Sequence, residues 1–282
     1  AIGAPAAWTL GDAEDVIVAV IDSAIDMTHP DLVDALLPGY DFCADNINCH
    51  AFDDDPHSGT KDAEHGTHIA GIIAAAHNND HGTVGIAPGA RILPVKVFPE
   101  GNDLGDTYTI SLAVRWAAGL PVEGAPTNPN PAHVINLSLG GDADNITLAD
   151  AISEAINAGA VVVAATGNDH KPVVSFPARM ESVIGVGALN HAWGRAAFSN
   201  YGAGLDIMAP GHYILASKPG GAVWYMDGTS MATPHVAAAA ALLLAHEPTL
   251  KPADVKELLM QAAYLPTGAS ASQFGAGVLR ID

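Results

Sequence analysis

Positive charge is scarce in this sequence. Its 11 lysine and arginine residues stand against 31 aspartate and glutamate residues, which gives a formal net charge of −20. Such an acidic surface repels nucleic acid and anionic membranes, and it favours solubility and cation binding. Most of these carboxylates are expected to form a solvated face, the usual place of surface charge. We therefore expect neither a nucleic-acid nor a membrane partner.

The sequence also lacks a long apolar run. The longest, Val236 to Ala245, is far shorter than the roughly 20 residues that span a bilayer. The first five residues, AIGAP, have neither a basic start nor an apolar stretch, so no signal peptide is predicted. Apolar residues still make up 49% of the chain and charged residues only 15%. This composition is typical of a compact globular enzyme and not of a disordered chain.

Cysteine is nearly absent, since the chain has only Cys43 and Cys49. Their spacing is not that of a zinc site, and no second pair of cysteines accompanies them. A short disulfide loop is the favoured interpretation, and a reduced pair in a cytosolic protein is the alternative.

Short apolar runs alternate with alanine-rich stretches, a pattern that predicts parallel β/α architecture, and no internal repeat is present. The predicted strands cover residues 16–21, 92–97, 134–139, 161–165, 182–187 and 205–208. The predicted helices cover residues 66–77, 109–118, 148–158, 230–246 and 252–263. Residues 43–64 and 119–133 are predicted to be loops. Neither loop has the character of a domain linker, so we expect one domain.

Three side chains of complementary chemistry each lie at the end of a predicted element. Asp22 ends a strand, and sites in parallel sheets form beyond the carboxyl ends of strands. His65 opens one helix. Ser230 lies at the N-terminus of another, where unpaired backbone N–H groups stabilise developing negative charge. A serine hydroxyl becomes a nucleophile when a neutral imidazole takes its proton, and a carboxylate orients and stabilises that imidazole. Together the three residues predict nucleophilic catalysis.

Each residue alone has a simpler interpretation. Asp22 would be a turn residue, and Ser230 would be an ordinary helix N-cap. His65 and His68 would be a metal-binding pair, but no glutamate accompanies them as in the helical zinc-protease motif. We interpret His68 as a buried, hydrogen-bonded histidine.

The segments that carry these residues are VIDSAID, HGTHIAGIIAA and GTSMATPHVA. They resemble the three signature segments of the subtilisin-like serine proteases, the subtilases, in which the order is also Asp, His, Ser. The stretches VGIAPGARILPVKV, VINLSLGG, VVVAATGN and SVIGVGA extend the resemblance from about residue 2 to about residue 281. The resemblance implies a three-layer α/β/α fold with a central, mainly parallel sheet. Residues 1–282 would form a single catalytic domain in a mature form without its prodomain.

The function implied by this resemblance is that of a secreted, monomeric serine endopeptidase. It would cleave proteins and peptides through an acyl-enzyme on Ser230, and its own prodomain or a protein inhibitor would be a further partner. Asn168 matches the side-chain donor of the family's oxyanion hole, which acts with the backbone N–H of Ser230.

The resemblance also implies a site for an extended substrate. One side of the substrate backbone would pair with Ser138, Leu139 and Gly140, and the other side with Leu104 and Gly105. Main-chain pairing of this kind gives affinity with little demand on sequence. The pocket for the side chain before the scissile bond would have Ala165, Thr166 and Gly167 as its wall and Ser175 near its base. Such a pocket is roomy and largely apolar, which predicts broad specificity with a preference for large apolar residues.

Residues 77–83 resemble the family's strong calcium loop. The implied ligands are the carbonyl oxygens of His77, His81 and Thr83, the side chain of Asn79 and the carboxylate of Asp31. Oxygen ligands of this mixed kind suit calcium, which accepts 6–8 of them in flexible geometry. A polar turn after a helix is the simpler alternative.

Two other functions fit the same resemblance. The first is a macrocyclase or transpeptidase, in which an amine replaces water and residues 43–64 or 119–133 shield the acyl-enzyme. The second is a catalytically inactive binding module, against which the intact triad and Asn168 argue.

Overall fold

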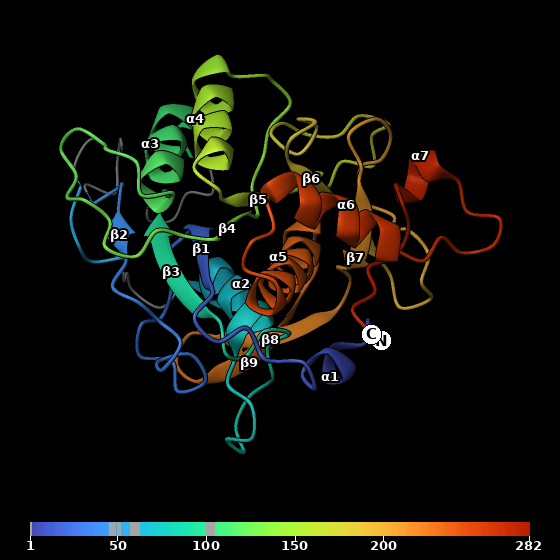
Figure 1. Cartoon of the computed structure of the whole chain (residues 1–282), viewed down its shortest axis with the longest axis horizontal. Coiled ribbons are helices and arrows are strands. Elements are labelled where there is room, and N and C mark those ends of the chain that lie inside the picture. The colour runs from blue at the N-terminus through green and yellow to red at the C-terminus, as the bar shows by residue number, and fades with distance from the viewer. Residues whose placement is uncertain (1, 45–48, 50–51, 57–62, 100–104) are drawn as a thin grey trace.

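The computed structural model describes residues 2–44, 49, 52–56, 63–99 and 105–282. Seven strands form one parallel sheet in the order β2-β3-β1-β4-β5-β6-β7 (Figure 1). They are β1 (Ile17–Asp22), β2 (Tyr40–Asp41), β3 (Arg91–Lys96), β4 (Val134–Leu137), β5 (Val161–Ala165), β6 (Ile184–Leu189) and β7 (Ile207–Pro210). A separate antiparallel hairpin consists of β8 (Ile214–Lys218) and β9 (Ala222–Met226).

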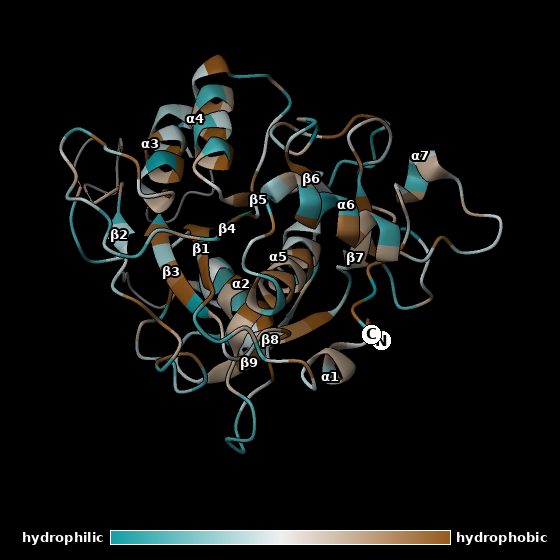
Figure 2. Cartoon of the chain, in the orientation of Figure 1, coloured by the Kyte–Doolittle hydropathy of each residue, from teal (hydrophilic) through white to brown (hydrophobic). Residues whose placement is uncertain are grey.

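The strand side chains alternate between two cores. Along β1, Val18 and Val20 pack into the core on one face of the sheet, whereas Ala19 and Ile21 pack into the core on the other. Because both faces are buried, a strand such as β5 is apolar along its whole length, which is typical of parallel sheets. Figure 2 shows β1 and β3 mainly in the brown of apolar residues, whereas α3, α4 and α6 carry both brown and teal.

Helices cover both faces of the sheet. They are α1 (Ala4–Ala7), α2 (Glu64–Ala74), α3 (Thr107–Ala117), α4 (Ile146–Asn157), α5 (Thr229–His246), α6 (Pro252–Ala262) and α7 (Ala271–Phe274). Helices α3 and α4 pack together on one face, and α2 and α5 pack on the other (Figure 1). Helix α5 is buried along most of its length, so its sequence is apolar on all sides. The predicted three-layer α/β/α fold is confirmed.

Some predicted boundaries are wrong. The helix expected over residues 66–77 ends at Ala74, because Ala75 has an extended ψ of 136° and the N–H of Ala76 bonds the carbonyl of Asp31. The strand expected over 134–139 ends at Leu137. The sequence pattern also does not predict β2, the β8–β9 hairpin or the short helices α1 and α7.

Strand β1 lies where the order of the sheet reverses. Its neighbours are β3 on one side and β4 on the other, so the chain leaves β1 in one direction and returns across it. Crevices at such switch points, beyond the carboxyl ends of the strands, are where α/β proteins bind ligands. Asp22 is the last residue of β1, so the fold places its carboxylate beside this crevice.

Cys43 and Cys49 form a disulfide, as expected from their spacing. Within the part of the chain that the structure describes, no helix could cross a bilayer.

Candidate active site

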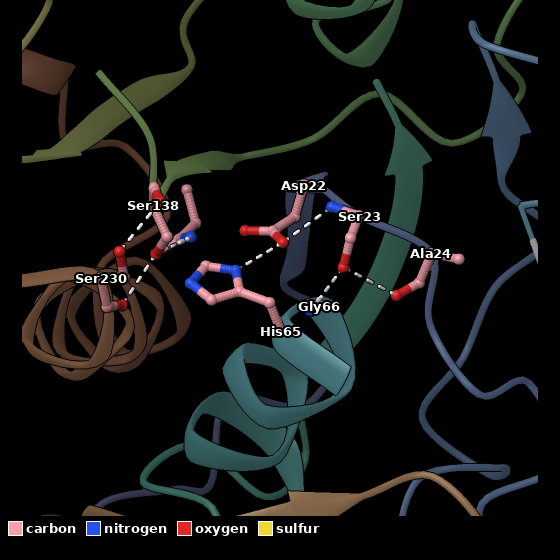
Figure 3. Close-up of polar contacts among 8 residues, drawn as sticks. Asp22, Ser23, Ala24, His65, Gly66, Ser138 and Ser230 are labelled. Atoms are coloured by element: carbon pink, nitrogen blue, oxygen red, sulfur yellow. Dashed lines mark hydrogen bonds and ion pairs between the residues drawn. The ribbon is translucent and has the colours of Figure 1, made fainter. Parts of the chain in front are cut away.

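Asp22 and His65 meet beside the carboxyl end of β1 (Figure 3). The Nδ1 atom of His65 lies 2.6 Å from Oδ1 of Asp22. The side chain of Asp22 is fully buried, whereas that of His65 is 31% exposed. Figure 3 shows the imidazole between Asp22 and Ser230, with its second nitrogen turned toward the serine. A carboxylate thus holds the ring from its buried side while the other nitrogen faces a hydroxyl.

Ser23 and Gly66 hold this pair in place. The N–H of Ser23 donates to Oδ1 of Asp22 at 2.7 Å, and its hydroxyl accepts from the N–H of Gly66 at 2.9 Å. A Cβ at position 66 would lie only 2.6 Å from the carbonyl oxygen of Ala24, so glycine alone lets α2 approach this closely.

Ser230 is the second residue of α5, and its hydroxyl donates to the carbonyl oxygen of Ser138 at 3.1 Å. Pro234, one turn later, lacks the N–H that would bond the carbonyl of Ser230. The hydroxyl of Ser138 donates to that carbonyl instead, at 2.8 Å. Asn136 in turn donates from Nδ2 to the Ser138 hydroxyl at 3.0 Å. Ser138 therefore supports both the side chain and the backbone of Ser230.

Asn168 follows β5 and contacts the start of α5. Its Oδ1 accepts from the N–H and the hydroxyl of Thr229, at 2.8 and 2.9 Å. Since both donors use the oxygen, the amide NH₂ group is the one that turns outward. A Cβ at Gly228 would lie 3.6 Å from Nδ2 of Asn168 and 3.5 Å from the N of Ser230. Two N–H donors therefore flank one small space beside the serine.

The expected pocket residues lie close to one another, and the N–H of Gly167 donates to the hydroxyl of Thr229 at 3.2 Å. A Cβ at Gly140 would lie 3.4 Å from Cβ of Ser175 and 3.6 Å from the carbonyl oxygen of Ala165. The carbonyl of Thr166 accepts from the N–H of Ser175 at 2.9 Å. Gly167 has a φ of 99°, and a Cβ there would lie 2.4 Å from Oγ of Ser175.

The other residues expected to pair with the substrate backbone are Leu139, Gly105 and Leu104. Leu139 is half-buried between Ser138 and the exposed Gly140. Gly105 lies two residues before α3. Leu104 lies outside the described residues.

A sequence model of the subtilase family matches residues 13–277 of this chain. The chain belongs to the subtilase family of serine endopeptidases. It is 39% identical to a subtilisin of Bacillus pumilus, over 100% of this chain and 95% of that protein. It is 38% identical to an extracellular protease of Xanthomonas campestris, over 98% of this chain but only 52% of that protein. This subtilase therefore spans about half the length of that relative.

The fold is shared with solved structures. A protease from Pseudoalteromonas arctica is 34% identical, with a TM-score of 0.91 over 99% of this chain and 92% of that one.

The expected calcium loop of this subtilase surrounds Asp31. Its carboxylate is buried, and it accepts from Nδ2 of Asn79 at 2.7 Å and from the N–H of Thr83 at 3.0 Å. Both donors are neutral. A Cβ at Gly82 would lie 2.2 Å from Oδ2 of Asp31, so the loop closes tightly over the carboxylate. The hydroxyl of Thr83 is buried without a hydrogen-bond partner among the described residues.

The chemistry of this loop fits a hard cation. The carbonyl oxygens of His77, His81 and Thr83 accept no hydrogen bond from other described residues. Groups of three or more His, Cys, Asp or Glu side chains suited to a metal are absent from those residues as well. The proposed site instead combines one carboxylate, one amide and several backbone carbonyls. Its donors are all oxygens, which calcium prefers.

Sequence reasoning missed several residues that support the site. Thr229 orients Asn168, Ser23 joins Asp22 to α2, and Asn136 holds Ser138. Thr229 and Ser23 could have been suspected, because each is a hydroxyl residue next to a candidate catalytic one. Asn136 offers no local signal, since it reads as one polar residue within a buried strand.

Proposed function

We propose that this subtilase hydrolyses peptide bonds in proteins, with Asp22, His65 and Ser230 as its catalytic triad. The observation that supports this most strongly is the line from the buried carboxylate through the imidazole to the hydroxyl at the start of α5 (Figure 3). His65 takes the proton of Ser230 as the hydroxyl attacks the peptide carbonyl, and then gives that proton to the leaving amine. Asp22 fixes the tautomer of His65 and stabilises its charged form.

The tetrahedral intermediate carries a negative oxygen, which needs preorganised donors. We assign this role to Nδ2 of Asn168 and the backbone N–H of Ser230, because both flank the space beside Gly228. The N-terminus of α5 adds its own positive potential there. Collapse of the intermediate yields an acyl-enzyme on Ser230, and water, activated by His65, then releases the acid.

Substrate selection follows from the pocket next to the nucleophile. Ser138, Leu139 and Gly140, with Leu104 and Gly105 opposite, would pair with an extended substrate backbone. Ala165, Thr166, Gly167 and Ser175 would enclose the side chain before the scissile bond. Apart from two hydroxyls these residues present small apolar groups and backbone. This supports broad specificity with a preference for large apolar side chains.

The proposal also includes a calcium site. Asp31, His77, Asn79, His81 and Thr83 would hold calcium, which neutralises a buried carboxylate and ties the loop to the fold. Asn79 would then offer the ion its Oδ1, which now accepts from the N–H of His81 at 3.2 Å.

The extracellular relative and the disulfide both support secretion. The resemblance favours a monomeric single catalytic domain over residues 1–282, with a prodomain or a protein inhibitor as a partner besides its substrates.

The deciding experiment compares the protein with Ser230→Ala. We expect the variant to fold and to lose several orders of magnitude in kcat, because triad members act as a unit. A fluorophosphonate should label the parent chain at Ser230 and leave the variant unlabelled. Product masses in the presence of an acceptor peptide separate hydrolysis from transpeptidation, and near-normal turnover by Ser230→Ala would refute the triad.

A further inference from the structure

Three charged side chains join the two segments, residues 138–142 and 165–171, that flank the proposed substrate pocket. The Nζ of Lys171 lies 3.1 Å from Oδ2 of Asp142 and 3.5 Å from Oδ2 of Asp169. Asp142 lies two residues after Gly140 of the proposed backbone-pairing segment, and Asp169 lies two residues after Gly167 of the pocket wall. The lysine therefore bridges the two segments two residues beyond Gly140 and Gly167.

The backbone beneath this bridge is firmly held. Oδ1 of the buried Asn200 accepts from the N–H of Asp169 at 3.0 Å and from that of Lys171 at 2.9 Å. In the other segment, Gly141 and Phe176 exchange two backbone hydrogen bonds of 2.8 Å each. The two carboxylates thus extend from fixed positions.

The three side chains remain open to solvent and to an approaching substrate. The exposed fractions are 76% for Asp142, 54% for Asp169 and 46% for Lys171. Ion pairs this exposed add little to stability. Their charges still act on a ligand that comes within a Debye length, about 8–10 Å at ordinary ionic strength.

We propose that Lys171 is a specificity-determining residue that keeps basic side chains out of the substrate pocket. This rests on the proposed function and adds which substrates the pocket rejects. Two carboxylates at a pocket rim would attract a lysine or arginine of the substrate, but Lys171 already occupies both. A basic side chain must therefore displace an ammonium group or lie beside it, which is selection by repulsion. An apolar side chain meets no such opposition.

The test measures kcat and KM for tetrapeptide p-nitroanilides that differ only in having Phe, Lys or Glu before the scissile bond. Lys171→Met removes the charge and keeps most of the apolar stem. Lys171→Arg keeps the charge. Arg280→Met is the matched control, because Arg280 forms a similarly exposed ion pair with Asp282.

For Lys171→Met we expect kcat/KM for the Lys substrate to rise about three- to tenfold. This is the effect expected when the substrate lysine forms one or two exposed ion pairs with the released carboxylates. The gain should appear mainly in KM, the Glu substrate should lose activity, and the Phe substrate should stay within about twofold. At about 1 M salt, where the Debye length is about 3 Å, the gain should disappear. Lys171→Arg and Arg280→Met should behave like the parent.

A second variant guards against indirect effects. Adding Asp142→Asn and Asp169→Asn to Lys171→Met removes the released carboxylates, so it should cancel the gain. If Lys171→Met changes all three substrates by the same factor, the lysine has only a structural role and the proposal is wrong. If the parent cleaves none of the three peptides, the proposed function itself fails, and this result is distinct from a failure of the charge preference.

Discussion

At the scale of single residues, Pro234 and Ser138 together determine how the carbonyl of Ser230 is hydrogen-bonded. The proline leaves the carbonyl of Ser230 without its helical donor, and the Ser138 hydroxyl, 92 positions away in sequence, supplies one. The nucleophile is therefore held by a contact between segments and not by the helix alone.

This arrangement predicts coupling between the two positions. Ser138→Ala leaves the Ser230 carbonyl unpaired, so unfolding free energy should fall by about 1–3 kcal/mol, and kcat should fall with it. Pro234→Ala restores a helical N–H, so it should be milder alone and should recover part of the loss in the double variant. Urea unfolding of the four proteins gives the interaction energy, which should exceed about 0.5 kcal/mol. Strict additivity would contradict the coupling.

Met231 is a second residue whose chemistry can be tested. It directly follows the proposed nucleophile, is buried, and its sulfur would lie 3.6 Å from a Cβ at Gly228, beside the two N–H donors. Peroxide converts it to a polar sulfoxide. Displacement of reacting groups by about 1 Å can cost about 10²-fold, so treated enzyme should lose roughly one to two orders of magnitude in kcat.

The control for this prediction keeps the volume of the side chain. Met231→Leu should retain its activity after peroxide, whereas Met180→Leu should stay as sensitive as the parent. Equal sensitivity of the parent and Met231→Leu would show that Met231 only fills the core.

At the scale of elements, the buried His68 and the half-buried His235 make the packing of α2 and α5 sensitive to acid. Burial lowers the pKa of His68 on α2 and of His235 on α5, each to about 4. Unfolding exposes them to water, where the ordinary value is about 6.5. Between about pH 4 and 6.5 the unfolded chain binds more protons than the folded one, so stability rises with pH in this window and levels off above it.

The expected loss from this effect is large enough to measure. From pH 6.5 to 5, each ring should cost about 2 kcal/mol of unfolding free energy. His68→Gln keeps a donor for the carbonyls of Ile214 and Trp224 and does not titrate, so its urea midpoint should fall less between pH 7 and 5 than that of the parent. The exposed His246→Gln should leave the fall unchanged. Parallel pH profiles for all three proteins would contradict the assignment.

The same contact shows why some elements escape prediction from sequence. Strands such as β5 are buried on both faces, so a continuous apolar run in the sequence predicts them. Strand β9 is exposed along most of its length, and its hairpin is fixed to α2 through His68, far away in sequence. The spacing of apolar residues along a short segment does not indicate such tertiary contacts.

The candidate site likewise contains residues that the sequence predicts and residues that it does not. Asp22, His65, Ser230 and Asn168 lie at element ends, where the family-like segments and the strand-end rule both point. The calcium ligands and pocket walls follow from the resemblance alone. The bridge formed by Lys171, and the support that Ser138 gives to Ser230, depend on segments that only folding brings together.

At the scale of the whole molecule, the excess of negative charge works against compactness. A net charge of −20 repels itself in the folded state. Asp31 is the clearest case, because its carboxylate is buried and accepts hydrogen bonds from the neutral N–H groups of Asn79 and Thr83. A bound divalent cation would offset that charge and close the loop over residues 77–83.

Calcium should therefore stabilise the entire fold. A ligand that binds only the native state adds about 2.7 kcal/mol at 100 times its Kd. For a chain of this size, removing it should lower the thermal midpoint by roughly 5–10 °C. EDTA should produce this fall and should speed autolysis, and added calcium should reverse both. Asp31→Asn should start from a lower midpoint and show no further fall, whereas Asp80→Asn, an exposed carboxylate in the same loop, should respond like the parent. A midpoint that EDTA leaves unchanged in the parent would refute the site. A fall of equal size in Asp31→Asn would move the calcium elsewhere, because the buried carboxylate is the one strong anionic ligand in the proposed set.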